Sequence, residues 1–307
     1  MLGHHPTLAR PAAVALLLSA VLVSSVPAPA ARAQDATPAV AGVPGIAAGD
    51  AAWARRAEGH QGGKAAAGPI DQAIAAYDQA VRQQPANLEA QWKLLRALHF
   101  KGEYVATTRE AKQAVFGRGR DLAEAALDRL ASRAGGRQKL AALTPQQEAR
   151  AVAGVPEAPP LYLYAAIHWG LWGDAFGRLA AARQGVGDRI RRYGEVVIAL
   201  DEKYETASGH RVIGRLHTLA PKVPFVTGWV DREKAVAELR KAVALAPEDP
   251  YNHLFLAEAL LEHQPGRAAE ARELLRKVIA WKPAAGHLVE DEKAIADARS
   301  LLASHGG

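Results

Sequence analysis

The sequence predicts an all-α fold in which amphipathic helices follow one another as consecutive pairs. Three observations support this prediction. From Pro69 onward, apolar residues recur at the spacing of one helix face. Runs that alternate apolar and polar residues, which are typical of half-buried strands, are almost absent. Prolines and glycines follow many of the helical stretches, where they end a helix and begin a turn.

The first element of the chain is an apolar run, AAVALLLSAVLVSSV (12–26), which Arg10 precedes. The run is shorter than the roughly 20 residues needed to span a bilayer, and prolines follow it. The tripeptide that ends at Ala33 has the small residues of a signal-peptidase site. We therefore expect a secretory signal over residues 1–33. An uncleaved membrane anchor is the alternative.

Composition restricts the function classes. Removal of the signal would leave a net charge of +4 with the basic residues dispersed along the chain. This pattern does not indicate a nucleic-acid partner. The chain contains no cysteine, which excludes disulfides, thiolate catalysis, thiolate metal sites and a lipid-modified N-terminal cysteine. Because an export signal is expected, the predicted location is the periplasm, in soluble form.

The next segment, residues 34–68, is rich in Ala, Gly and Pro. One short helix is expected around Trp53, and GHQGGKAAAG (59–68) is expected to be a loop. The helical domain is then predicted over residues 69–303.

One pattern recurs three times in that domain: a small residue, a large one four positions later, a small one three later, and a proline five later. The copies are AIAAYDQAVRQQP (73–85), AVAELRKAVALAP (235–247) and ARELLRKVIAWKP (271–283). The first three positions form a stripe on one helix face, and the proline ends the helix. The pattern resembles the tetratricopeptide repeat, a pair of helices of about 34 residues. The resemblance implies a solenoid or superhelix of about ten to twelve helices. An irregular helical bundle is the alternative.

The middle of the chain contains a cap and an aromatic helix. TPQQEARAVAG should begin with a capping box at Thr144. In the aromatic stretch YLYAAIHWGLWG, Tyr164, His168 and Trp172 align on one helix face. Trp169 lies on another face. One face should pack in the core and the other should line a cavity. Ordinary core packing of both faces is the alternative.

An apolar, proline-containing insert interrupts one helix pair. In GRLHTLAPKVPFVTGWV (214–230), the eleven residues from Ala220 to Val230 separate two helices that a normal repeat joins by a few residues. Burying one large apolar side chain contributes ~1.5–3 kcal/mol. We therefore expect the insert to fold against the helices as a plug, a cavity wall or an oligomer contact, with Trp229 buried. An Ω-type loop that fills its own gap is the alternative.

These elements together predict a pocket for an organic acid, with tryptophans as apolar walls and an arginine that binds the carboxylate. Arg211 is the expected clamp, although solvated arginines on a helix surface are the alternative. The predicted ligand-binding residues are Tyr164, His168, Trp169, Trp172, Arg183, Arg211, His217, Phe225 and Trp229. No catalytic motif, short metal-ligand motif or cofactor motif stands out, so we predict no enzyme, no metal and no cofactor.

Five stretches carry a resemblance to a transporter family. HWGLWG, ARQGVGDRI, DEKYE, GRLHTLAPKVPFVTGWVDREKA and PEDPYNHLFLAEALL look like the T component of tripartite ATP-independent periplasmic (TRAP) transporters. The resemblance covers residues 160–265 well and the N-terminal repeats more loosely. It implies a periplasmic, non-enzymatic accessory that associates with the transporter's substrate-binding protein and passes apolar organic acids through a helical cavity. Many members of that family are lipoproteins, whereas this chain lacks the required cysteine.

The alternative function is a periplasmic scaffold for protein interactions that binds no small ligand. A cavity behind Trp169, Trp172 and Trp229 would favour the transport accessory. A solid core with an exposed concave groove would favour the scaffold. A homo-oligomer is compatible with both.

Overall fold

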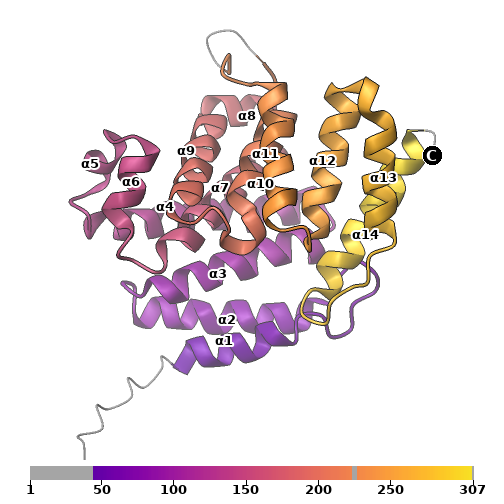
Figure 1. The fold of residues 1–307 in the computed structure, drawn as a ribbon. Coiled ribbons are helices and arrows are strands. Elements are labelled where there is room, and N and C mark those ends of the chain that lie inside the picture. The colour runs from indigo at the N-terminus through magenta and orange to yellow at the C-terminus, as the bar shows by residue number, and fades with distance from the viewer. Residues whose placement is uncertain (1–43, 223–226, 306–307) are drawn as a thin grey trace, which may run out of the picture. The chain divides into compact units, whose positions relative to one another are not determined.

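The computed structural model describes residues 44–222 and 227–305 (Figure 1). In this part of the chain the structure is all-helical and has no β-strand, which confirms the prediction of an all-α chain. The expected signal (1–33) and Phe225 lie outside the described residues. The fourteen described α-helices are α1 Pro44–Ala54, α2 Ala67–Gln83, α3 Leu88–Phe100, α4 Arg109–Ser132, α5 Arg137–Ala141, α6 Pro145–Val152, α7 Ala158–Phe176, α8 Arg178–Arg183, α9 Val186–Leu200, α10 Tyr204–Leu219, α11 Arg232–Leu245, α12 Pro250–His263, α13 Ala268–Ile279 and α14 Leu288–Ser304.

Helices α1, α2 and α3 form a first layer, in which the predicted stripe of α2 is fully buried. Ala73, Tyr77 and Ala80 are inaccessible to solvent. Helix α1 approaches this stripe closely, because Gly49 leaves room for the Tyr77 ring and the Tyr77 hydroxyl donates to Asp50 at 2.7 Å. The packed helices therefore begin before residue 69, with α1.

Helices α10 to α14 pack in sequence order, each against the next. Helix α12 also contacts α10 and α14, so it has neighbours on both sides. The stripes predicted on α11 and α13 face these contacts, since their six residues are inaccessible to solvent: Ala235, Leu239, Ala242, Ala271, Leu275 and Val278. Four residues join α11 to α12, and Asp249 caps α12 by accepting from the Tyr251 backbone.

The middle of the chain is built around the two longest helices, α4 and α7. Helix α7 packs against α4, α9 and α3. Its buried side chains lie on all sides, so no face of it is left for solvent along most of its length. Helix α6 begins with the expected capping box, in which Thr144 accepts from the Gln147 backbone and the Gln147 side chain accepts from the Thr144 backbone.

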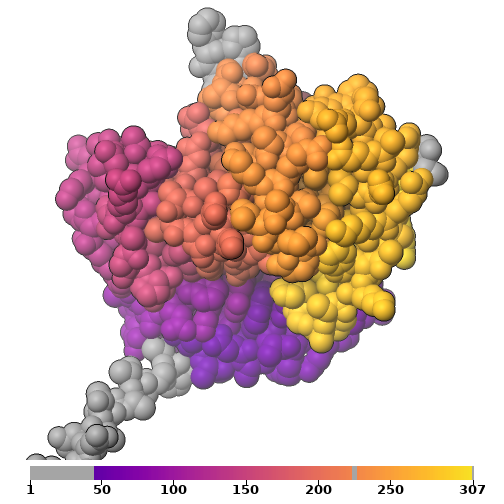
Figure 2. All heavy atoms as spheres, viewed as in Figure 1, coloured from indigo at the N-terminus to yellow at the C-terminus, as the bar shows by residue number. Residues whose placement is uncertain are grey.

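The first layer also contacts the last helix, at a place that we call the α1–α14 junction: residues 55–66 together with α14. Arg56 pairs with Glu290 at 2.9 Å and donates to the Gly286 carbonyl. Val289 of α14 lies in the same apolar cluster as Tyr77. Figure 2 shows the violet and yellow surfaces meeting here. Segments more than 200 residues apart thus share one core.

None of the described helices is both long enough and apolar enough to cross a membrane.

Candidate functional site

The two tryptophans of the aromatic helix are part of the core. Trp169 and Trp172 are 3% and 6% exposed, and their rings meet edge to face at 5.7 Å. The Trp169 indole N–H donates to Glu124 at 2.7 Å. The guanidinium groups of Arg120 and Arg189 lie over the Trp169 ring at 5.4 and 4.7 Å. Each indole is therefore held by side chains of neighbouring helices.

The other predicted residues of α7 are also enclosed. His168 is inaccessible to solvent, and its Nε2 lies 2.9 Å from the Leu95 carbonyl oxygen, to which it donates. Burial lowers the pKa of His168 to about 3, so the imidazole is neutral at physiological pH. Tyr164 is 5% exposed and packs beside His99, with ring centroids 6.1 Å apart. These contacts give both residues a structural role.

Arg211, the expected carboxylate clamp, binds a carboxylate of its own chain. Its Nη1 pairs with Asp249 at 2.6 Å and donates to the Asn252 side chain at 2.9 Å. Burial acts to raise the pKa of Asp249, but Arg211 and the Thr206 hydroxyl outweigh it and hold that pKa below its ordinary value. Because Asp249 caps α12, the pair ties α10 to the start of α12. Arg183 lies on the exposed helix α8, away from this pair.

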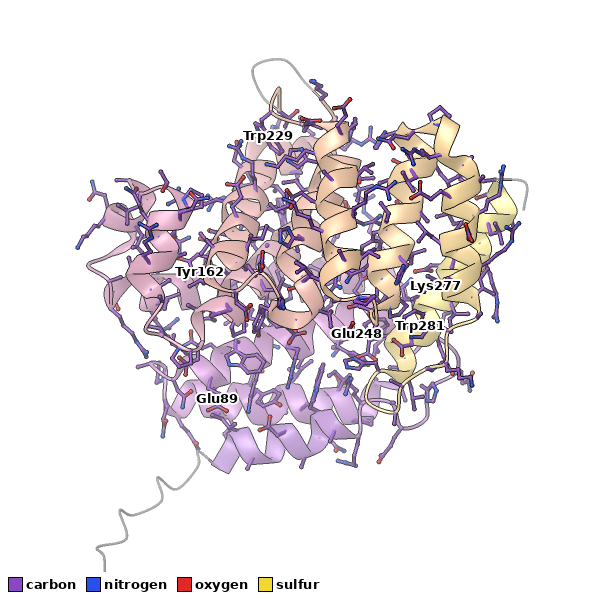
Figure 3. The ribbon with its side chains drawn as sticks, viewed as in Figure 1. Glu89, Tyr162, Trp229, Glu248, Lys277 and Trp281 are labelled. Atoms are coloured by element: carbon purple, nitrogen blue, oxygen red, sulfur yellow. The ribbon has the colours of Figure 1, made fainter. Side chains whose placement is uncertain are left out.

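The insert packs by Trp229, which is labelled in Figure 3. Trp229 is half-buried rather than fully buried. Its ring meets His217 edge to face at 5.5 Å, and the Arg191 guanidinium lies 4.7 Å from the ring centroid. Gly187, in the first turn of α9, leaves room for the ring. Burial, with nearby Lys234, lowers the pKa of His217 to about 4, and its Nδ1 accepts from the Asp231 backbone.

The predicted residues thus occupy separate places instead of one pocket. Tyr164, His168, Trp169 and Trp172 lie in the core around α7, Arg211 lies at the α10–α12 contact, and His217 and Trp229 lie under the insert. None of the predicted residues lines either of two cavities in the described part of the chain, one near α1 and α14 and a small one between α2, α3 and α4.

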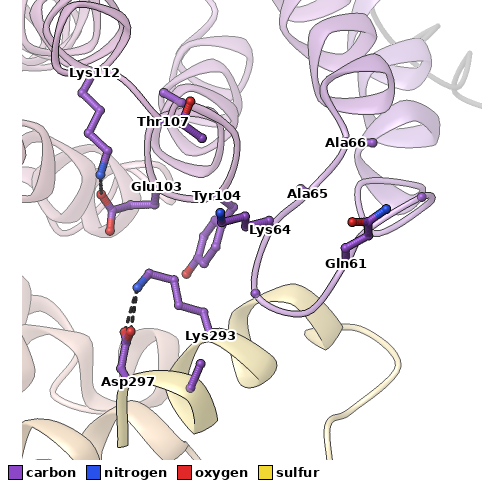
Figure 4. A pocket seen from close by; sticks show the side chains of 14 residues that line it. Gln61, Lys64, Ala65, Ala66, Glu103, Tyr104, Thr107, Lys112, Lys293 and Asp297 are labelled. Atoms are coloured by element: carbon purple, nitrogen blue, oxygen red, sulfur yellow. Dashed lines mark hydrogen bonds and ion pairs between the residues drawn. The ribbon is translucent and has the colours of Figure 1, made fainter. Parts of the chain in front are cut away.

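The larger cavity lies at the α1–α14 junction and has a volume of about 810 Å³ (Figure 4). Four segments enclose it: the loop over residues 59–66, the π-helical turn Lys101–Val105 with the residues after it, the start of α4, and the middle of α14. Its side chains are lysines, carboxylates, a tyrosine and several alanines. They include Lys64, Ala65, Ala66, Glu103, Tyr104, Ala106, Lys112, Lys293, Ala296 and Asp297.

Tyr104 is the most enclosed polar side chain of the cavity. It is 8% exposed, and its hydroxyl lies 3.3 Å from the Tyr251 hydroxyl. Burial first, and Tyr251 second, raise the pKa of Tyr104 well above its ordinary value. The phenol is therefore protonated at physiological pH and can donate a hydrogen bond.

Three lysines reach the cavity from three segments. Lys293 pairs with Asp297 at 2.8 Å, and Lys112 lies 3.9 Å from Glu103. Lys64 has no ion-pair partner among the described residues. Figure 4 shows the three side chains around the same space, with Tyr104 between them. The site therefore offers a ligand one unpaired ammonium group and, when the Tyr251 hydroxyl donates to Tyr104, one hydroxyl donor.

Sequence reasoning placed the pocket elsewhere because the residues of this cavity come from four segments that are separated in sequence, one of which is a loop with the composition of a linker. The sequence feature that could have indicated this cavity is the glycine cluster of the loop over residues 59–66. In it, Gly59 and Gly62 adopt positive φ angles of 72° and 57°. Compared with known proteins, the chain matches no family model and no curated protein.

Proposed function

We propose that this protein is a non-enzymatic periplasmic accessory of a TRAP-type solute transporter. In this proposal it binds an organic acid in the cavity at the α1–α14 junction and associates with the transporter's substrate-binding protein. The cavity carries the proposal. Its volume of about 810 Å³ falls within the range of ligand pockets, which is roughly 300–1,000 Å³.

The lining favours an amphipathic anion. The unpaired ammonium group of Lys64 and the protonated hydroxyl of Tyr104 are both donors, and a carboxylate accepts from such groups. Ala65, Ala106 and Ala296 supply apolar surface for the body of the ligand. A medium-chain or aromatic carboxylate matches both properties.

The helix packing supports a tetratricopeptide-like stack. The recurring stripes face neighbouring helices, and α12 contacts both α10 and α14 besides the helices next to it in sequence. Such contacts between alternate helices are expected of consecutive stacked pairs.

The resemblance to the T component is supported by how its stretches meet. Trp229 from the insert contacts Gly187 from ARQGVGDRI and His217 from GRLHTL. Two of the stretches that carry the resemblance, ARQGVGDRI and GRLHTLAPKVPFVTGWVDREKA, therefore pack together at one place, which gives a structural reason for their joint occurrence.

Thermal unfolding with a panel of carboxylates at millimolar concentration tests the ligand. A ligand that binds the folded state raises the Tm by mass action. Lys64→Ala should weaken binding about 10- to 150-fold, because it removes a charge-assisted hydrogen bond of ~1.5–3 kcal/mol. Lys282→Ala is the matched control, since Lys282 is exposed and does not line the cavity. It should leave the Tm increase unchanged.

Isothermal titration with a TRAP-type substrate-binding protein tests the partner. If no carboxylate raises the Tm and that protein does not bind, the transport proposal is wrong. Binding of protein partners without any Tm increase would instead indicate the alternative, a periplasmic scaffold without a small ligand.

A further inference from the structure

Large hydrophobic side chains are exposed at one edge of the molecule. In the described part, Phe176, Leu179 and Leu219 are 37%, 66% and 47% exposed, and the other large hydrophobic side chains are more enclosed. Phe176 ends α7, Leu179 lies on α8 and Leu219 ends α10. Helix α9 begins at the same edge and packs on α7, α8 and α10 (Figure 1). We call this place, residues 176–191 with Leu219, the α8 edge.

Helix α8 packs on the core only through Ala180 and Ala181, which are partly buried. None of its six residues is buried. Glycines with positive φ stand at both of its ends, Gly177 at 94° and Gly185 at 61°. Such angles favour glycine, so the chain turns sharply into α8 and out of it again. The sequence thus forms a short helix whose leucine faces outward.

The charge of the α8 edge is positive. Arg178 and Arg183 begin and end α8, and neither has an ion-pair or hydrogen-bond partner in the described part of the chain. Arg183 follows Leu179 by four positions, so the two side chains share a helix face. Arg191 pairs with Asp188 at 3.3 Å, and Arg189 lies 3.6 Å from Glu124. The two arginines of α8 therefore stay available to an external anion.

We propose that the α8 edge docks on a membrane surface that contains anionic phospholipid. Phe176, Leu179 and Leu219 enter the boundary between headgroups and acyl chains. Arg178 and Arg183 lay their aliphatic stems along that boundary and donate to lipid phosphates, since guanidinium groups match phosphate oxygens in geometry.

The shape of the α8 edge favours a lipid surface over a peptide. Its apolar side chains lie on or beside helix ends, and Arg178 and Arg183 stand close to Leu179 in sequence, so the edge combines the apolar and cationic side chains of helices that lie at a membrane interface. Peptide recognition uses a groove, and the cavity at the α1–α14 junction is lined by other residues. This proposal is independent of the ligand proposed for that cavity.

A fluorescent label can test the contact at one position, because the chain contains no cysteine. Leu179→Cys, carrying an environment-sensitive dye in the full chain, should brighten with vesicles of phosphatidylethanolamine and phosphatidylglycerol. It should not brighten with phosphatidylcholine vesicles. The same dye on Ala303→Cys is the control, since Ala303 is exposed on α14. This local readout separates the α8 edge from binding by any other segment.

Charge variants test the role of the arginines. Arg178→Gln with Arg183→Gln should weaken the response at position 179 about 25-fold, because each cation at an anionic surface contributes about fivefold. Arg82→Gln with Arg299→Gln is the matched control, since both arginines are exposed outside the α8 edge, and it should change little. Equal far-UV dichroism and Tm establish that all variants are folded.

Three outcomes would overturn the proposal. The first is an unchanged dye at position 179 with anionic vesicles. The second is an equal response to phosphatidylcholine, which would remove the role of charge. The third is a dye response that depends on protein concentration without vesicles, which would assign the α8 edge to contacts between copies of the chain.

Discussion

The core around α7 and the α1–α14 junction differ in composition and in packing. The first holds two tryptophans and several tyrosines, whose rings pack together, and the Trp169 indole N–H donates to Glu124. The second holds lysines, carboxylates and alanines around an open volume of about 810 Å³. Aromatic density in this chain therefore marks the filled interior, and the space for a ligand lies where segments distant in sequence meet.

The first prediction concerns the filled interior. Trp169→Ala should reduce the free energy of unfolding by ~3–5 kcal/mol, because it removes a buried indole and leaves Glu124 without one of its donors. Urea unfolding followed by circular dichroism measures this loss. Lys64→Ala, at the junction, should change stability by less than about 0.5 kcal/mol. Equal losses at the two positions would contradict the contrast between the regions.

The second prediction concerns pH and the buried histidines. Burial lowers the pKa of His168 to about 3, whereas an unfolded histidine titrates near 6.5. Below about pH 6.5 the His168 imidazole therefore binds a proton in the unfolded state but not in the folded state. Stability is fully present above that pH and is lost as the pH falls toward 3, by about 1.4 kcal/mol per unit for this group.

The pKa values of His99 and His217, both lowered to about 4, act in the same direction. Unfolding free energies measured between pH 7 and pH 5 test the prediction. His168→Gln keeps a donor for the Leu95 carbonyl but cannot titrate, so this variant should lose part of the pH dependence. An unchanged slope in that variant would show that His168 is not the group responsible.

The sequence predicted the elements whose signals are local. The stripe of Ala73, Tyr77 and Ala80 is buried as expected, since helical periodicity decides which side chains share a face. The Thr144 cap needs only three neighbouring residues and is also confirmed.

Contacts between residues that are distant in sequence could not be predicted from the sequence in the same way. Arg211 can bind a carboxylate, as expected, but it already pairs with the carboxylate of Asp249, the residue that caps α12. Arg56 and Glu290 are 234 positions apart, and no local pattern pairs them. The cavity at the α1–α14 junction depends on such contacts, so its residues were identified only from the structure.

The third prediction concerns the insert, which is intermediate between the two regions. Trp229→Ala should cost about 1–3 kcal/mol, less than Trp169→Ala, because Trp229 is only half-buried and its indole N–H has no hydrogen-bond partner in the described part. Chemical unfolding measures the loss, and iodide quenching of the indole measures its exposure. A loss as large as that of Trp169→Ala would place the insert in the core.

The last prediction concerns the backbone of the α1–α14 junction, where only a small effect on stability is expected. A Cβ added at Gly63 would lie 2.6 Å from the Lys293 Cα, and the backbone of α14 cannot move aside within its helix. The loop over residues 59–66 should shift instead, at a cost of about 1 kcal/mol, the lower end of overpacking effects. Gly63→Ala should therefore change the cavity more than the fold, so that a carboxylate no longer raises the Tm. Gly68→Ala is the matched control, since an added Cβ there meets no atom within 4 Å. If Gly63→Ala keeps the full ligand response, the cavity does not depend on the closeness of this loop to α14.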